Sequence, residues 1–253
     1  MSVAKYFKRG LFASLVFGLF PLYLAFTLRI ADFNDLIFFS LGGGTLSSLT
    51  SLHSRLLFAV APLVFLYLYS DFLTSDLETA AVYVFTRRAG YARHVRRKLA
   101  WLLFHTAVYT FLCMLWTLSV IAAFGMDGQK PDLTLLLLPG MLSLLSNMAL
   151  VLAIGLIALL WQALYFYLIV ATLYVITALA VPLLPGKSMQ LMLYVNPFAQ
   201  GFYAWHMESA ARYPEYPGGS STLTAVYSCC YLVVFIVIEA WLFYRWLKTA
   251  DYR

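Results

Sequence analysis

Two ionisable side chains lie inside long apolar runs, where a charge is costly and often serves a function. His105 lies seven residues after Lys98, early in the third apolar run, and Glu239 lies in the last run. The alternatives are a packed, satisfied histidine and an ion pair between Glu239 and a nearby basic residue. Neither residue has a second His or carboxylate at metal-ligand spacing. The sequence therefore predicts no metal site.

Other motifs that could carry out chemistry are incomplete. Gly186-Lys187-Ser188 matches the end of a phosphate-binding loop, but Val181 occupies the position of the first glycine of that motif. A nucleotide site of this type also needs a strand before the loop and a helix after it. The sequence has neither His-Glu-x-x-His nor Gly-x-Ser-x-Gly, and no paired intramembrane aspartates. We therefore expect no cofactor and no hydrolytic activity from this chain.

A polar stripe follows one face of the fourth apolar run. Ser143, Ser146 and Asn147 are spaced at i, i+3 and i+4, so a helix places them together. Hydrogen bonding between membrane helices uses such residues. The functional interpretation is a pathway lined by these three side chains.

The composition identifies the environment in which these residues work. The 253-residue chain is 63% hydrophobic and 11% charged, whereas soluble domains carry about 25% charged residues. Runs of roughly 20 apolar residues predict membrane-spanning helices. The sequence predicts an all-α integral membrane protein, a single domain over residues 1–253, with six spans at about 11–30, 56–73, 99–124, 133–161, 164–184 and 223–247.

The basic residues predict the orientation. Six spans put both termini on one side of the membrane, and cytoplasmic loops are enriched in Lys and Arg. With both termini in the cytoplasm, the inner segments hold 12 of the 17 basic residues: Lys5, Lys8, Arg9, Arg87, Arg88, Arg93, Arg96, Arg97, Lys98, Arg245, Lys248 and Arg253. This bias explains the net charge of +6 without a nucleic-acid partner.

Residues 71–98 form the one long charged segment, between the second and third spans. Ser75-Asp76-Leu77-Glu78 is a capping box, which predicts a helix start. Arg87-Arg88 falls near the negative end of that helix, and Gly90 stands where a C-terminal cap belongs. An orientation signal or attraction to anionic lipid would explain the basic residues alone. A helix that docks on a cytoplasmic partner also explains the acidic start and the apolar face. A second helix is expected from about Tyr91 into the third span.

Two external segments complete the expected layout. Residues 31–55 contain Gly42-Gly43-Gly44, which cannot hold a regular helix cheaply, and we expect an external, partly re-entrant loop. Residues 185–222 are too apolar for a solvent loop and too interrupted for a span. We expect one or two short helices there that dip into the outer leaflet.

Together these features resemble an ABC-2-type transporter permease over the whole chain. Such permeases carry a cytoplasmic coupling helix between the second and third spans, and the matching residues here are Glu78, Thr86-Arg87-Arg88, Arg93 and Lys98. They also carry a re-entrant helical segment before the last span, often near a turn such as Asn196-Pro197-Phe198. The proline that many members carry just before the Arg turn is absent.

The resemblance implies partners and a function. A separate ATPase, in two copies, would dock on Glu78, Tyr83, Arg87, Arg88 and Arg93, and two permeases would complete the transporter in the inner membrane. Its substrate would be amphipathic: a peptide, an antibiotic or a lipid-linked molecule. The alternatives are a membrane-embedded enzyme or regulatory subunit without a transport path and, on weaker grounds, a secondary transporter.

Overall fold

The computed structural model describes residues 3–27, 30, 32–42, 50–74, 90–125, 133–160, 164–184, 186–206 and 223–250. Every regular element in these ranges is helical. The prediction of an all-α protein is therefore confirmed for the part of the chain that is described. The predicted docking helix, within residues 75–89, lies outside it.

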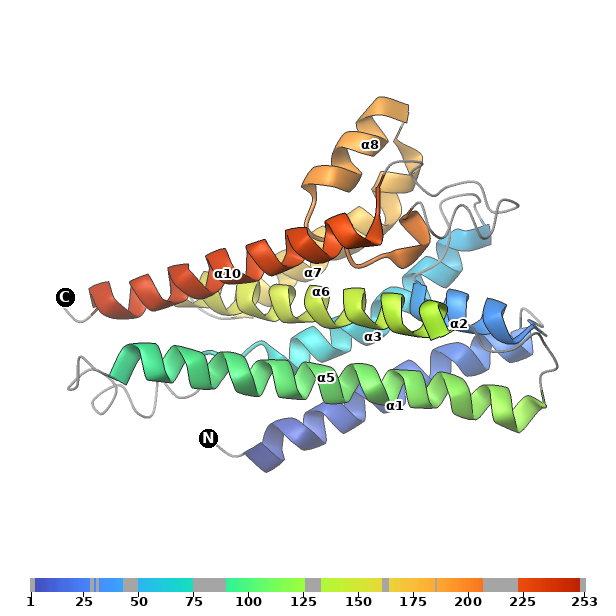
Figure 1. Cartoon of the computed structure of the whole chain (residues 1–253), viewed down its shortest axis with the longest axis horizontal. Helices are drawn as coiled ribbons and strands as arrows, with labels where there is room; N and C mark the ends of the chain where they lie inside the picture. The colour runs from blue at the N-terminus through green and yellow to red at the C-terminus, as the bar shows by residue number, and fades with distance from the viewer. Residues whose placement is uncertain are drawn as a thin grey trace.

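Within the described part of the chain, four helices are long and apolar enough to cross a membrane. They are α1 (Val3–Thr27), α5 (Gly90–Phe124), α6 (Leu133–Leu160) and α10 (Ala225–Ala250). They run along the long axis of the molecule, and the start of α1, the start of α5 and the end of α10 lie toward the same end of it (Figure 1). The chain is thus a helical, membrane-embedded protein.

Two further helices occupy the expected second and fifth spans. They are α3 (Thr50–Tyr69) and α7 (Leu164–Ala180), whose apolar parts, Phe58–Tyr69 and Tyr167–Ala180, are shorter than those of the other four. A 3-10 turn, η1 (Val181–Leu183), continues α7, with a proline in its first turn. Whether all six helices cross the bilayer stays a prediction.

The start of the first helix differs from that expected, whereas the start of α5 agrees with the prediction. The first helix begins at Val3 rather than near residue 11, because a polar and basic first turn is compatible with helical backbone. The third expected span begins at Gly90, so α5 carries the basic residues before Lys98 as one continuous helix. The helix start predicted near Tyr91 is confirmed.

The structure contains a helix, α2 (Phe33–Gly42), where a loop was expected. The Asp32 carboxylate starts it by accepting hydrogen bonds from the backbone amides of Asn34, at 2.8 Å, and Asp35, at 3.2 Å. Leu36 and Ile37 are fully buried, and α2 packs against α6, α1 and α5. The prediction of a loop is wrong over this range, because α2 includes only the first glycine of the run, Gly42, as its last residue.

The segment before the last span contains short helices, as predicted. They are α8 (Gly186–Val195), which projects from the bundle (Figure 1), and η2 (Tyr203–Trp205). The centroid of the Phe202 ring lies 4.3 Å from the ring centroid of Trp205, 5.6 Å from that of Tyr174 and 5.7 Å from that of Phe58. These aromatic contacts seat residues 196–206 on α3 and α7.

Gly201 makes the closest approach between this segment and α6. A Cβ atom added to Gly201 would lie 2.6 Å from the Oγ of Ser146 and 2.9 Å from its Cβ. Both distances are shorter than van der Waals contact, so the segment can lie this close to α6 only with glycine at this position.

We predict that Gly201→Ala destabilises the protein by about 1–3 kcal/mol, the usual cost of an overpacked site. Thermal unfolding of the purified protein in detergent measures the effect. Gly42→Ala is the matched control, because its Cβ would meet nothing nearer than 3.5 Å. Adding Ser146→Gly to Gly201→Ala removes both clashing atoms and should restore part of the stability. Equal unfolding temperatures for Gly201→Ala and the wild type would contradict the contact.

Candidate functional site

The turn at residues 70–74 joins α3 to the predicted docking segment. The backbone amide of Phe72 donates to the carbonyl of Tyr69 at 3.0 Å, which closes the turn directly after α3. Phe72 and Leu73 are fully buried although they lie at the end of a helix. Residues from three other helices converge on this turn.

The first of these helices is α1, which holds the turn through two ion pairs. The Nη1 of Arg9 lies 2.5 Å from Oδ1 of Asp71, and the Nζ of Lys5 lies 3.3 Å from Oδ2. Arg9 also donates to the backbone carbonyl of Leu68 at 2.8 Å. Arg9 therefore ties α1 both to the last turn of α3 and to the turn that follows it.

The charge of Asp71 depends on these partners. Partial burial raises the pKa of its carboxyl, but the hydrogen bond and charge of Arg9, assisted by Lys5, outweigh burial and hold the pKa below the ordinary 3.8. The ion pairs therefore stabilise the fold above that ordinary value. The contribution is lost as the pH falls through the lower pKa of the folded protein.

The second helix is α5, which reaches the turn through Lys98. This side chain is buried, and its Nζ donates to the backbone carbonyl of Phe72 at 2.6 Å and lies 5.0 Å from the centre of the Phe72 ring. A buried ammonium group needs such partners to offset its lost hydration. Lys98 therefore fixes the start of the third expected span against the end of the second.

The third helix is α6, which receives Leu73 at a glycine. A Cβ atom on Gly155 would lie 2.2 Å from the Cδ1 of Leu73 and 2.8 Å from its Cβ. Leu73 therefore fills the space left by the missing side chain of Gly155. Charge on α1, a hydrogen bond from α5 and close packing on α6 together hold this turn, which we name the junction turn.

The docking residues predicted from the sequence all follow the junction turn in the chain. Glu78, Tyr83, Arg87 and Arg88 lie outside the described residues. Arg93 is exposed in the first turn of α5. The structure thus places the two ends to which the predicted docking helix is attached.

The two intramembrane ionisable residues both carry an atom without a hydrogen-bond partner in the described residues. These atoms are the Nε2 of His105 and the Oε2 of Glu239. The rings of Tyr6, Tyr69 and Phe72 surround His105 with centroids 5.8–6.3 Å away. No ion pair joins Glu239 to a described basic residue. The interpretation of Glu239 as half of an ion pair therefore finds no support in the described part of the chain.

The predicted polar stripe is present on one face of α6 and takes part in packing. The Nδ2 of Asn147 donates to the Oγ of Ser143 at 3.2 Å, and Ser146 lies against Gly201. Ser146 and Asn147 are buried and Ser143 is half-buried. In this conformation the stripe supports helix packing, and its role as a pathway stays a prediction.

The sequence reading missed a buried hydrogen-bond network that joins residues 196–206 to α10. The Oγ of Ser228 donates to Oε1 of Gln200 at 2.5 Å, and the Nε2 of His206 lies 2.7 Å from the same Oγ. Gln200 donates to the carbonyl of Leu193 at 2.5 Å. All three side chains are fully buried. The Ser–His contact has the geometry of a nucleophile and its base, but Ser228 gives its proton to Gln200, so the network is a structural connection.

A second connection joins the same segment to α7. The Nδ2 of Asn196 donates to the Oγ1 of Thr177 at 2.9 Å, and its Oδ1 accepts from the amide of Phe198 at 2.9 Å. Asn196 thus caps the turn that follows α8. No sequence signal could have paired Asn196 with Thr177, because the two residues lie 19 positions apart and belong to common polar types.

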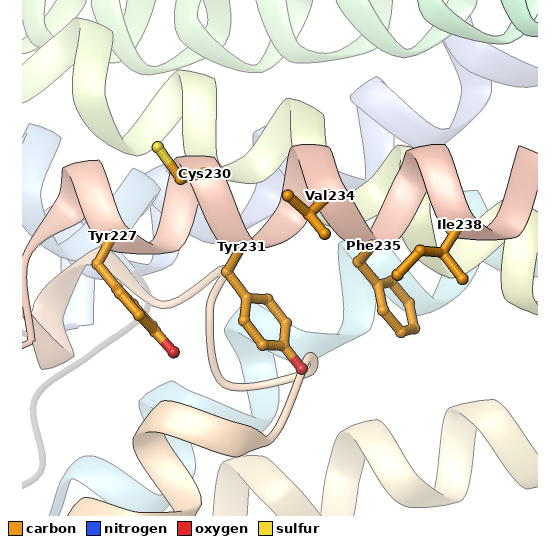
Figure 2. A pocket seen from close by; sticks show the side chains of 6 residues that line it. All are labelled: Tyr227, Cys230, Tyr231, Val234, Phe235 and Ile238. Atoms are coloured by element: carbon orange, nitrogen blue, oxygen red, sulfur yellow. The ribbon is translucent and has the colours of Figure 1, made fainter.

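An apolar groove of about 380 Å³ lies along α10 and is lined by side chains of that helix. Figure 2 shows the six side chains that line it: Tyr227, Cys230, Tyr231, Val234, Phe235 and Ile238. The hydroxyl of Tyr231 donates to the carbonyl of Val195 at 2.7 Å, and that of Tyr227 to the carbonyl of Tyr194 at 3.2 Å. Because both hydroxyls are bonded, the groove presents mainly hydrocarbon, which suits a surface facing lipid.

Comparisons of the chain with models of known protein families, with curated proteins and with solved structures found no match. The role of the junction turn is therefore inferred from its own contacts.

We predict that Asp71→Asn loosens α1 from the junction turn and lowers the unfolding temperature at neutral pH. Because the Asp71 side chain is 40% exposed, the loss should stay below about 1 kcal/mol. Unfolding in detergent should show the difference from wild type shrinking as the pH falls below 3.8 and through the lower pKa of Asp71 in the folded protein. Lys8→Gln, a change at an exposed residue of the same helix, should leave stability unchanged. A difference that persists at the lowest pH would count against the ion pairs.

Proposed function

We propose that this chain is the permease subunit of an ABC-2-type transporter that exports an amphipathic substrate with power from a separate ATPase. The observation that carries the proposal is the junction turn, where α1, α5 and α6 all hold the residues directly before the predicted docking helix. A docking helix transmits force only if its attachments are stiff. Asp71 and Lys98 provide such attachments on either side of residues 75–89.

Force from the ATPase pair would enter through the docking helix and reach the spans at the junction turn. A displacement of Asp71 pulls on Arg9 and therefore on α1. The same displacement moves Phe72 against Lys98 of α5 and Leu73 against Gly155 of α6. Three spans thus respond together, which an alternation between inward-open and outward-open states requires.

The distribution of charge supports a cytoplasmic location for this end. Exposed basic residues lie on the first turns of α1 and α5 and on the last turns of α10: Lys5, Lys8, Arg93, Arg96, Arg97, Arg245 and Lys248. By the positive-inside rule this end faces the cytoplasm, with both termini. The protein then spans the inner membrane six times, through α1, α3, α5, α6, α7 and α10.

The opposite end would form the exit for the substrate. Residues 196–206 lie over the polar stripe of α6 at Gly201 and are bonded to α10 and α7 through Ser228 and Thr177. Opening a path along Ser143, Ser146 and Asn147 requires this segment to move. The substrate is a peptide, an antibiotic or a lipid-linked molecule, and a second permease and two ATPase subunits complete the assembly.

We predict that Arg87→Glu with Arg88→Glu abolishes co-purification of the ATPase, because the docking surface reverses its charge. The tagged chain is solubilised gently, and ATPase content and vanadate-sensitive hydrolysis are measured in the eluate. Lys130→Glu with Lys187→Glu is the charge-matched control on the proposed outer side and should retain the ATPase. Undiminished ATPase in the Arg87/Arg88 variant would reject docking at this segment.

We further predict that Lys98→Met separates hydrolysis from transport. The ATPase should still bind, because the docking segment is unchanged, but stimulation of hydrolysis by substrate should fall severalfold as the link to Phe72 is lost. Lys98→Arg keeps the charge and the donors and should recover part of the stimulation. Normal stimulation in Lys98→Met would show that the junction turn does not transmit the force.

A further inference from the structure

Glu239 has no assigned role, and its surroundings are unusual for a carboxyl group. It lies in the middle of α10, is only 4% exposed, and its Oε2 has no hydrogen-bond partner among the described residues. Its neighbours on the same face of the helix are Leu232, Ile236 and Phe243, all buried. This face is the one by which α10 packs in the bundle, since its residues are buried whereas most of the groove residues are exposed.

Among the described residues, no ion pair joins Glu239 to the helices that pack against α10. They are α6 and α5. The whole of α6 contains no ionisable side chain. On α5, Lys98 is bonded to Phe72, and His105 is enclosed by rings of α1 and α3. Near its start α5 also carries the half-buried His94 and the exposed Arg93, Arg96 and Arg97, none of which is paired with Glu239. Its other buried ionisable groups are Tyr109, which stacks on Phe65 of α3, and the thiol of Cys113.

The charged groups of α10 itself also lie away from Glu239. Arg245 and Lys248 follow by six and nine residues, which places them about 9 and 14 Å further along the helix. Both are exposed, and the guanidinium of Arg245 lies over the ring of Trp241 at 5.3 Å. Glu239 thus meets an apolar helix interface without a counter-ion in the described part of the chain.

An ionised carboxylate in such a place would lose its hydration without gaining a partner, whereas the protonated acid carries no net charge. The packed arrangement of α10 therefore suits the acid form alone. We propose that Glu239 is an intramembrane proton-binding site whose occupancy is linked to the packing of α10 against α6 and α5. The proton is taken from water when α10 packs and returned when α10 separates and the carboxylate is hydrated.

The linkage has a defined sign. In the hydrated state a glutamate ionises in its ordinary range, near pH 4.3. The packed state binds one more proton than the separated state above that pH, so packing weakens as the pH rises. This property stands whether or not the chain is a permease, because it requires neither ATP nor a substrate.

Infrared spectroscopy of the full chain in lipid vesicles at neutral pH tests the protonation state directly. Glu239→Gln should remove intensity from the carbonyl band of protonated carboxylic acids. Asp71→Asn is the matched control and should remove ionised-carboxylate intensity instead, because Asp71 is paired with Arg9 and Lys5. Loss of ionised-carboxylate intensity in Glu239→Gln would overturn the proposal.

Thermal unfolding as a function of pH tests the linkage. The wild type should lose stability as the pH rises from the ordinary glutamate range toward alkaline values, and Glu239→Gln should lose less. Glu239→Leu, which removes the polar atoms altogether, provides a second neutral variant should the buried amide impair folding. If the wild type and the folded neutral variants show the same dependence on pH, Glu239 is not the proton site.

Discussion

The hydrogen bond from the buried ammonium of Lys98 to the carbonyl of Phe72 is the contact on which the proposed inner end of the bundle depends. It fixes the end of α3 against the start of α5, although 26 residues separate the two partners in the chain. A lysine that is buried without its partner would be costly, so the turn and the helix start must stay together. The ion pairs of Asp71 and the packing of Leu73 on Gly155 hold the same turn from the other sides.

The two ends of the bundle are held by different chemistry. At the junction turn, full charges meet at the edge of the apolar region, where water still reaches them in part. At the other end, neutral groups make the contacts. Buried amide, hydroxyl and imidazole side chains form hydrogen bonds around Ser228, and aromatic rings stack around Phe202. Charged contacts respond to pH and salt, whereas the neutral set responds mainly to geometry.

The sequence predicted those features that depend on local pattern. Apolar runs predicted α5, α6 and α10 to within a few residues at most boundaries, apart from the basic start of α5. The loop expected in place of α2 shows the limit of prediction from local pattern. Asp32 beside a glycine run suggests a loop by composition, whereas in the structure Asp32 caps the start of a helix. The junction turn could not be predicted, since Arg9 and Asp71 lie 62 positions apart. The same is true of the pairing of Gln200 with Ser228.

The anchors on both sides of residues 75–89 also bear on how the chain could be divided. Arg9, Lys98 and Gly155 hold the junction turn through contacts that do not pass through that segment. A break in the backbone within residues 75–89 would therefore leave the two pieces joined by side chains and by the packing of α1 and α3 against α5, α6 and α7. The protein is thus suited to assembly from two separately synthesised polypeptides. Residues 75–89 could then be replaced or labelled in one of the two pieces.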